Sequence, residues 1–229
     1  AALARVYADL GRPEEAFVIL SRLVQAGPIS AAIALDRGTL ARRLGRFTLA
    51  MECYDAALSL DPDLANAWTG KANLLHEHGN YAEALHCHDH AIARQPDNVE
   101  VICNRTATLS RLGRLEEALA ESNRALKIAP DDPDAWTTRG CTLVQMEDLE
   151  QAMRCFDQAL RINPRHRPAF ANRASTLATL GKHQEALELF EAALSLAQAY
   201  PSELAALHTK KGMLKLMLGD WKGWEDYEH

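Results

Sequence analysis

Apolar and small residues recur along this chain at helical spacing, and the same unit appears several times. Within residues 133–166, Trp136 and Gly140 lie at i and i+4, on one face of a predicted helix. Ala152 and Phe156 repeat that spacing and predict a second helix. The unit is therefore a pair of amphipathic helices.

This unit repeats along the chain at intervals of 34 residues. Proline closes the unit at four evenly spaced positions, Pro62, Pro96, Pro130 and Pro164. Alanine recurs at the same interval at Ala50, Ala84, Ala118, Ala152 and Ala186. A fixed period of this length is typical of stacked units that each pack on their neighbours. The sequence therefore predicts an all-α solenoid of antiparallel helix pairs.

The turn inside each unit has a glycine at one place, which suits a left-handed helix C-cap. These glycines are Gly11, Gly45, Gly79, Gly113, Gly181 and Gly219. Glu147 occupies this place in the remaining unit, so we expect a strained or differently built turn there.

The pattern resembles the tetratricopeptide repeat family, which places a bulky residue first, then a small one, and then Ala, an aromatic residue, Ala and Pro. The bulky place holds Trp68, Ile102, Trp136 and Phe170. The small place holds Gly38, Ala72, Thr106, Gly140, Ala174 and Gly212. The aromatic place holds Tyr54, Phe156 and Phe190, but also His88 and Ser122.

The resemblance covers nearly the whole chain and implies one right-handed superhelical solenoid over residues 1–229. First helices would line its concave wall, and second helices its convex back. The repeats are 1–30 (partial), 31–64, 65–98, 99–132, 133–166, 167–200 and 201–229 (partial or capping). Because residues 1–30 begin partway through a first helix, we expect the true N-terminus to be missing.

The period slips by four residues after Leu196, through residues 198–202. We expect the next first helix to run from Ser202, its N-cap, to Leu218. Its inward places hold Met213, Leu216 and Met217. This apolar stripe indicates either a covering partner or a self-packed terminal helix or dimer contact.

Composition excludes several partner classes. The chain has 229 residues, of which 48% are hydrophobic and 24% charged, with a net charge of −6. Basic residues are scattered, which argues against nucleic acid as the main partner. No apolar run approaches the roughly 20 residues of a membrane helix.

The five cysteines indicate a reducing compartment. Cys53, Cys87 and Cys155 stand at equivalent places, where stacked helices lie about 8–10 Å apart. This is beyond the reach of a disulfide, so we expect free thiols there and at Cys103 and Cys141, in a cytoplasmic protein.

Polar residues on the first helices are the candidate ligand-binding site. Amide side chains both donate and accept hydrogen bonds, so they suit a peptide backbone, although solvation alone also explains them. The candidates in the concave groove are Asn66, Asn73, Asn104, Thr137, Thr138, Asn172 and Ser175.

One cation stands at a matching place in each first helix. These residues are Arg37, Lys71, Arg105, Arg139, Arg173 and Lys211. We expect their stems to cover core surface and their heads to reach a carboxylate or carbonyl of a neighbouring helix. Alternatively, Arg105, Arg139 and Arg173 anchor an acidic or phosphorylated partner.

Residues 65–98 are rich in histidine. His86 and His90 lie at i and i+4, a spacing that can hold a metal, but the sequence places no third ligand. His88 stands at the aromatic place and is expected in the core. We therefore predict no metal and no cofactor. No catalytic motif appears on a suitable element, so this stretch is interpreted as non-catalytic.

Residues 218–228 resemble a segment of bacterial tetratricopeptide proteins that precedes a glycosyltransferase-like region. That resemblance implies a recognition arm with an asparagine row, which Asn104 and Asn172 match, whereas Asp36, Gly70, Thr138 and Lys210 depart from it. Alternatively, Trp221 and Trp224 cap the hydrophobic end of the array.

The favoured function is a scaffold that binds a protein or peptide in the concave groove. The alternatives are substrate recognition for a bacterial glycosyltransferase and self-assembly into a homo-oligomer through the terminal repeats.

Overall fold

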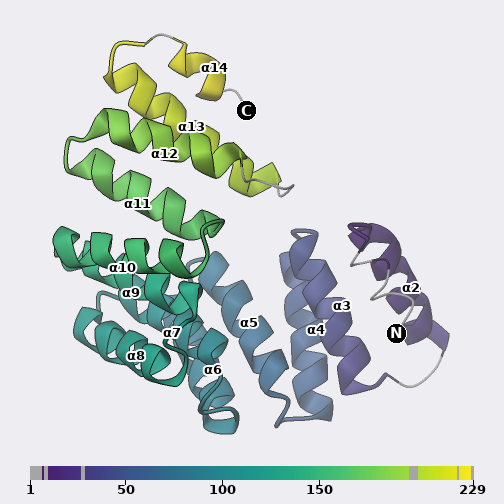
Figure 1. Ribbon diagram of the computed structural model, residues 1–229. Coiled ribbons are helices and arrows are strands. Elements are labelled where there is room, and N and C mark those ends of the chain that lie inside the picture. The colour runs from purple at the N-terminus through teal and green to yellow at the C-terminus, as the bar shows by residue number, and fades with distance from the viewer. Residues whose placement is uncertain (1–6, 8–9, 27–28, 196–200, 221, 228–229) are drawn as a thin grey trace. The chain divides into compact units, whose positions relative to one another are not determined.

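The computed structural model describes residue 7 and residues 10–26, 29–195, 201–220 and 222–227. These residues form helices, and there is no strand among them, so the all-α prediction is confirmed (Figure 1). The structure divides into two compact units, residues 1–113 and 114–229.

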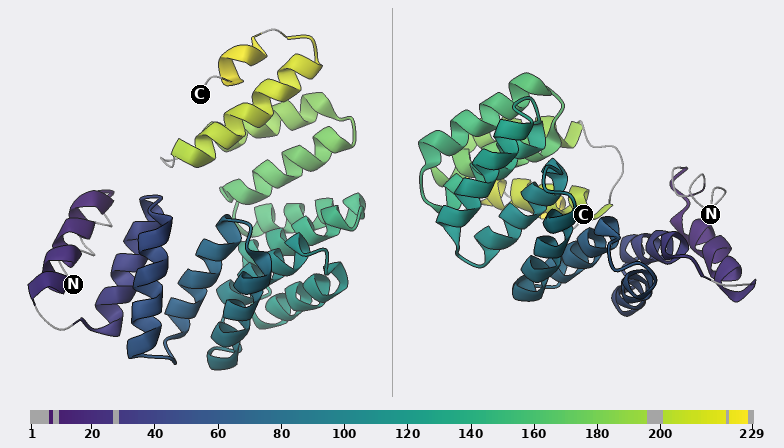
Figure 2. Two further views of the ribbon diagram at one scale, coloured as in Figure 1. Left: turned by 180° about the vertical axis from the view of Figure 1, so that it is seen from behind. Right: turned by 90° about the horizontal axis from the view of Figure 1, so that it is seen from below.

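The first unit contains helix pairs that pack in chain order (Figures 1 and 2). Its helices are α2 (Pro13–Ala26), α3 (Ala31–Arg43), α4 (Phe47–Leu60), α5 (Ala65–Glu77), α6 (Tyr81–Arg94) and α7 (Val99–Arg111). Besides its contacts with α4 and α6, α5 contacts both α3 and α7. The first helices of successive repeats therefore form a continuous wall.

The second unit is built in the same way. Its helices are α8 (Leu115–Ile128), α9 (Pro133–Gln145), α10 (Leu149–Ile162), α11 (Arg167–Thr179), α12 (His183–Ser195), α13 (Pro201–Met217) and α14 (Gly223–Tyr227). Here α11 contacts the first helices α9 and α13. Helix α13 begins at Pro201, so Ser202 lies in its first turn and is not the N-cap, because proline suits the first helical position. The period slip itself falls mainly on residues outside the described part of the chain.

Close helix packing depends on matched residue sizes across each pair. The alanines of the second helices, such as Ala50 and Ala152, are fully buried. The ring of Phe156 occupies the space beside Gly140, where an added Cβ would lie 2.5 Å from Phe156 Cε1. Tyr54 fills the same space beside Gly38. Phe156 and Tyr54 are both fully buried, so each ring is a main core element of its repeat.

The turn at Glu147 has the unusual geometry that the sequence indicated. Its φ is 63°, and the six glycines at the equivalent turns have φ between 68° and 81°. Glu147 therefore adopts the left-handed conformation that its side chain disfavours.

Candidate functional site

The first helices of the first unit carry a polar pocket of about 200 Å³. Helices α3, α5 and α7 each contribute to it. Its lining residues are Arg42, Asn73, His76, Glu77, Asn104 and Ala107. The structure thus brings together two candidates that the sequence selected, Asn73 and Asn104, from adjacent repeats.

The side-chain amides of Asn73 and Asn104 are available for a ligand. Both residues are half-buried. Within the described part of the chain, neither side-chain amide has a hydrogen-bond partner. Each amide can donate and accept, so the pair can hydrogen-bond an extended backbone laid across the two helices.

Charged and neutral groups flank these amides. Arg42 and Glu77 form an ion pair that connects α3 with α5. His76 Nδ1 lies 2.9 Å from Thr108 Oγ1 on α7. Burial, and then the charge of Arg111, lower the pKa of His76, so the ring is neutral at pH 7. The pocket therefore offers amides, one neutralised ion pair and an uncharged imidazole.

Sequence reasoning missed Arg42, His76 and Glu77 as parts of this site. Arg42 and Glu77 are 35 residues apart, one more than the repeat period. Opposite charges at that separation on successive first helices were the signal that could have found them.

The candidates in the second unit have other surroundings. Asn172 Nδ2 on α11 donates to Cys141 Sγ on α9 at 3.2 Å. Ser175 Oγ accepts from Lys210 Nζ at 3.3 Å and donates to the Ala171 carbonyl. Asn172 and Ser175 are thus engaged within the unit.

The expectation for Thr137 was wrong. Its side chain is buried and donates to the Pro133 carbonyl at 2.7 Å, because it faces the packing side of α9. The next residue, Thr138, is half-buried, and Asn66 is exposed at the start of α5 outside the pocket.

The asparagine row is interrupted at Gly70 for a steric reason. A Cβ at Gly70 would lie 2.6 Å from Tyr54 Cε1. The Tyr54 ring, inserted from α4, therefore occupies the space that a larger residue needs.

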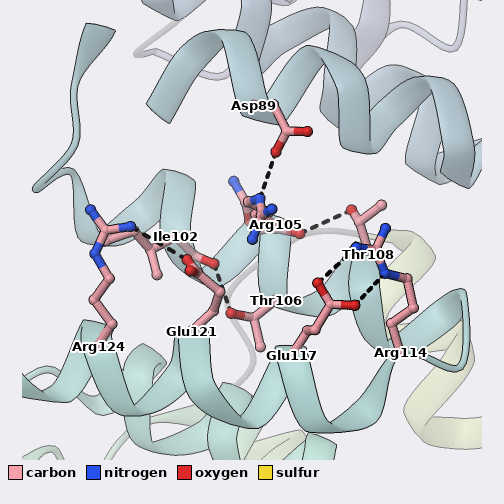
Figure 3. Close-up of polar contacts among 10 residues, drawn as sticks. Asp89, Ile102, Arg105, Thr106, Thr108, Arg114, Glu117, Glu121 and Arg124 are labelled. Atoms are coloured by element: carbon pink, nitrogen blue, oxygen red, sulfur yellow. Dashed lines mark hydrogen bonds and ion pairs between the residues drawn. The ribbon is translucent and has the colours of Figure 1, made fainter. Parts of the chain in front are cut away.

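Five of the six cations of the first helices contact a polar side chain of the preceding second helix, as the structural interpretation expected, whereas Arg37 lies over the Phe17 ring of α2 at 5.4 Å. Arg105 Nε lies 2.8 Å from Asp89 Oδ1. Figure 3 shows this contact and, separately, the pairs Arg114–Glu117 and Arg124–Glu121. The corresponding contacts elsewhere are Lys71–Asp55 (2.6 Å), Arg139–Asn123 (3.0 Å), Arg173–Asp157 (2.7 Å) and Lys211–Glu191 (3.7 Å). These contacts favour a structural role, and the anchor role of Arg105, Arg139 and Arg173 stays a prediction.

The cysteines are free, as expected. Burial raises the pKa of Cys87 and of Cys141 to about 11, so neither is a thiolate at neutral pH. Among the residues that the structure describes, no group of three or more His, Cys, Asp or Glu side chains is placed to hold a metal ion.

Apolar side chains gather on the last helices. Met213 and Met217 of α13 are 51% and 70% exposed, and Trp224 of α14 is 55% exposed. The predicted apolar stripe is thus at the surface. Trp221, the other half of the predicted cap, lies outside the described residues.

Family models described as tetratricopeptide repeat match most of the chain. The matched segments are residues 1–65, 35–98, 69–133, 106–171 and 168–200. No curated protein matches the chain. None of the described helices combines the length and apolarity needed to cross a bilayer.

Solved structures share the fold at low identity. A tetratricopeptide repeat protein from Parabacteroides merdae ATCC 43184 is 20% identical with a TM-score of 0.80, over 99% of this chain and 89% of its own. The APC/C hetero-tetramer Cut9–Hcn1 contains a chain that is 17% identical with a TM-score of 0.80, over 98% of this chain and 44% of that one. YrrB, a protein with an unusual peptide-binding site, is 22% identical with a TM-score of 0.55, over 87% of this chain and 97% of its own. These likenesses confirm the predicted solenoid of stacked helix pairs.

Proposed function

The chain belongs to the tetratricopeptide repeat family, and from that premise we propose that it is a non-catalytic scaffold that binds an extended peptide segment of a partner protein. The segment lies along the first helices of the first unit. Asn73 and Asn104 hydrogen-bond its backbone, and the ion pair of Arg42 and Glu77 lies beside it.

The observation that carries this proposal is the pair of unengaged amides in a preformed pocket. A buried polar group without a partner is costly, so half-buried amides at the surface retain water that a peptide backbone can replace. A preformed wall also lowers the ordering cost of binding, which then falls mainly on the peptide. The peptide-binding site named for YrrB supports this use of the fold by analogy.

The chemistry of the pocket predicts modest affinity. Each amide hydrogen bond contributes about 0.5–1.5 kcal/mol net, so two of them alone give weak binding. A micromolar dissociation constant is expected for one peptide, with tighter binding when a partner contacts several repeats. The five free cysteines support a reducing compartment such as the cytoplasm as the site of this binding.

The test uses a library of unstructured peptides displayed against the intact chain, followed by calorimetry on a selected peptide. The double variant Asn73→Ala/Asn104→Ala should weaken binding by about tenfold or more, because two hydrogen bonds are lost. Asn66→Ala, an exposed amide of the same helix outside the pocket, is the matched control and should bind as the native chain does.

A second arm of the experiment separates backbone binding from side-chain recognition. Methylating the peptide nitrogens that face the pocket should abolish binding, whereas conservative side-chain exchanges should change it little. Equal binding by the double variant and the native chain would contradict the proposal.

One alternative is substrate recognition for a bacterial glycosyltransferase. Asn104 and Asn172 at one shared place, and the segment 218–228, support it. The coding sequence beyond His229 tests it, because a stop codon there removes this alternative.

Self-assembly is the other alternative, and the exposed Met213, Met217 and Trp224 support it. Light scattering across a dilution series tests it, because a constant monomer mass would contradict self-assembly.

A further inference from the structure

Two histidines of α6 form a cluster that the proposed binding function does not use. His86 is exposed and His90 is half-buried, and they lie one helical turn apart. Their Nε2 atoms are 3.2 Å apart, and their rings are nearly perpendicular, at 86°. The two Nε2 atoms therefore lie next to each other at the surface of α6.

The second ring is held in place by neighbours from α5 and α6. His90 stacks on Trp68 with ring centroids 4.3 Å apart. Trp68 is itself anchored, because its Nε1 donates to the Pro62 carbonyl at 2.9 Å. Arg94 donates to the His90 carbonyl, and Asp63 neutralises Arg94 at 2.8 Å. The position of His90 Nε2 is therefore set before any ligand arrives.

We propose that His86 and His90 form a two-histidine chelate for a borderline divalent cation such as Zn²⁺ or Ni²⁺. A zinc ion holds imidazole nitrogens at about 2.0–2.1 Å, so two such nitrogens in a tetrahedral site stand about 3.3 Å apart. The observed separation of 3.2 Å is close to this edge, so a small rotation of the rings is enough to direct both nitrogens at one cation. Water completes the coordination, which leaves positions open for a further ligand.

Without metal, the same geometry is a hydrogen bond between two imidazoles, one donating and one accepting. When the cation binds, the proton of the donating ring moves from its Nε2 to its Nδ1, so that both Nε2 lone pairs can bind the cation and both rings stay neutral.

The chelate is separate from the peptide pocket. Both histidines belong to the second helix α6, whereas α3, α5 and α7 line the pocket. Metal binding and peptide binding can therefore be tested independently, and failure of one leaves the other standing.

The experiment titrates the intact chain with ZnCl₂ and with NiCl₂ by calorimetry, after treatment with a chelator and a reductant. One site per chain with a micromolar dissociation constant is expected, together with a rise in melting temperature, because the metal binds the folded helix preferentially. MgCl₂ and CaCl₂ should not compete, since they prefer oxygen ligands.

Variants identify the ligands. His86→Gln and His90→Gln should each weaken binding by at least about tenfold, the lower end of the loss seen when even an outer-shell partner is removed. His78→Gln, at an exposed histidine of the same repeat, is the matched control and should bind normally. In NMR spectra of the native chain, the ring signals of His86 and His90 should move first.

Three results would overturn the proposal. They are no binding of either metal at micromolar concentration, unchanged affinity in either His→Gln variant, and competition by Ca²⁺, which would indicate a carboxylate site instead. Circular dichroism of each variant verifies that the helices remain folded.

Discussion

Replacing His88 should remove a large pH dependence from the stability of the fold. His88 stands where other repeats carry Tyr54, Phe156 and Phe190, and it is fully buried. Within the described part of the chain, neither of its ring nitrogens has a hydrogen-bond partner. Its pKa is lowered from 6.5 to about 4, mainly by burial and then by the charges of His76 and Arg105, and Asp89 opposes this lowering.

The sign and the size of the effect follow from proton linkage. Below pH 6.5 the unfolded chain binds a proton at His88, whereas the folded chain does not until the pH is much lower. Acid therefore favours unfolding. A lowering from 6.5 to about 4 corresponds to about 3 kcal/mol, lost as the pH falls through that window. About 2 kcal/mol of this should be lost between pH 7.5 and pH 5.0.

The variant His88→Phe tests this contribution. Phe190 already packs at the equivalent place of a later repeat, where Ala174 faces it as Ala72 faces His88, so the ring fits. The free energy of unfolding should be measured by urea denaturation at pH 7.5 and at pH 5.0. Between pH 7.5 and pH 5.0 the free energy of unfolding of the variant, relative to that of the native chain, should rise by about 2 kcal/mol.

Ser122→Ala is the control, because it changes a buried residue at the equivalent place that carries no titrating group. Its effect should be the same at both pH values. A stability difference for His88→Phe that is independent of pH would refute the reasoning, because it would mean that His88 titrates alike in the folded and unfolded chains.

Three further substitutions test the packing of single repeats. Glu147→Gly should raise the free energy of unfolding by about 0.5–1 kcal/mol, since φ at 63° suits glycine, and a lower melting temperature would contradict this. Gly140→Ala should lower the free energy of unfolding by about 1–2 kcal/mol, because crowding against Phe156 outweighs the better helix propensity of alanine. Thermal melts measure this loss. Arg105→Ala should lower the free energy of unfolding by about 0.5–1 kcal/mol, because the pair with Asp89 is lost, and peptide affinity should stay unchanged. Weaker peptide binding by this variant would instead favour the anchor role of Arg105.

The fold was predictable because packing residues must repeat. Within each unit every helix pair packs on the next, so core residues such as Ala152 and Phe156 recur at a fixed interval that can be read from the sequence. The structural role of the cations was predictable for the same reason, since Arg105 and Arg173 reach acceptors sixteen residues earlier. The unusual turn at Glu147 was predictable too, because glycine stands at that place in the other repeats.

The candidate site was only partly predictable because its residues follow no period. Thr137 and Thr138 differ by one position, which on a helix is a rotation of about 100°, and this decides between core and surface. Sequence reasoning chose both, and only Thr138 lies on the partly exposed face. Arg42 and Glu77 escaped notice because their pairing depends on how two successive first helices lie side by side.

Positions that depart from the repeat pattern make the candidate binding wall differ from one repeat to the next. Gly70 could have been read as a lost asparagine, yet it is the complement of Tyr54, whose ring fills the space above it. Beyond that interruption, the wall of the first unit has amides in two adjacent repeats, at Asn73 and Asn104, beside the pair of Arg42 and Glu77. At this one place the Tyr54 ring thus excludes a larger residue from the wall. The residue at Gly70 of this wall is therefore set by core packing against Tyr54.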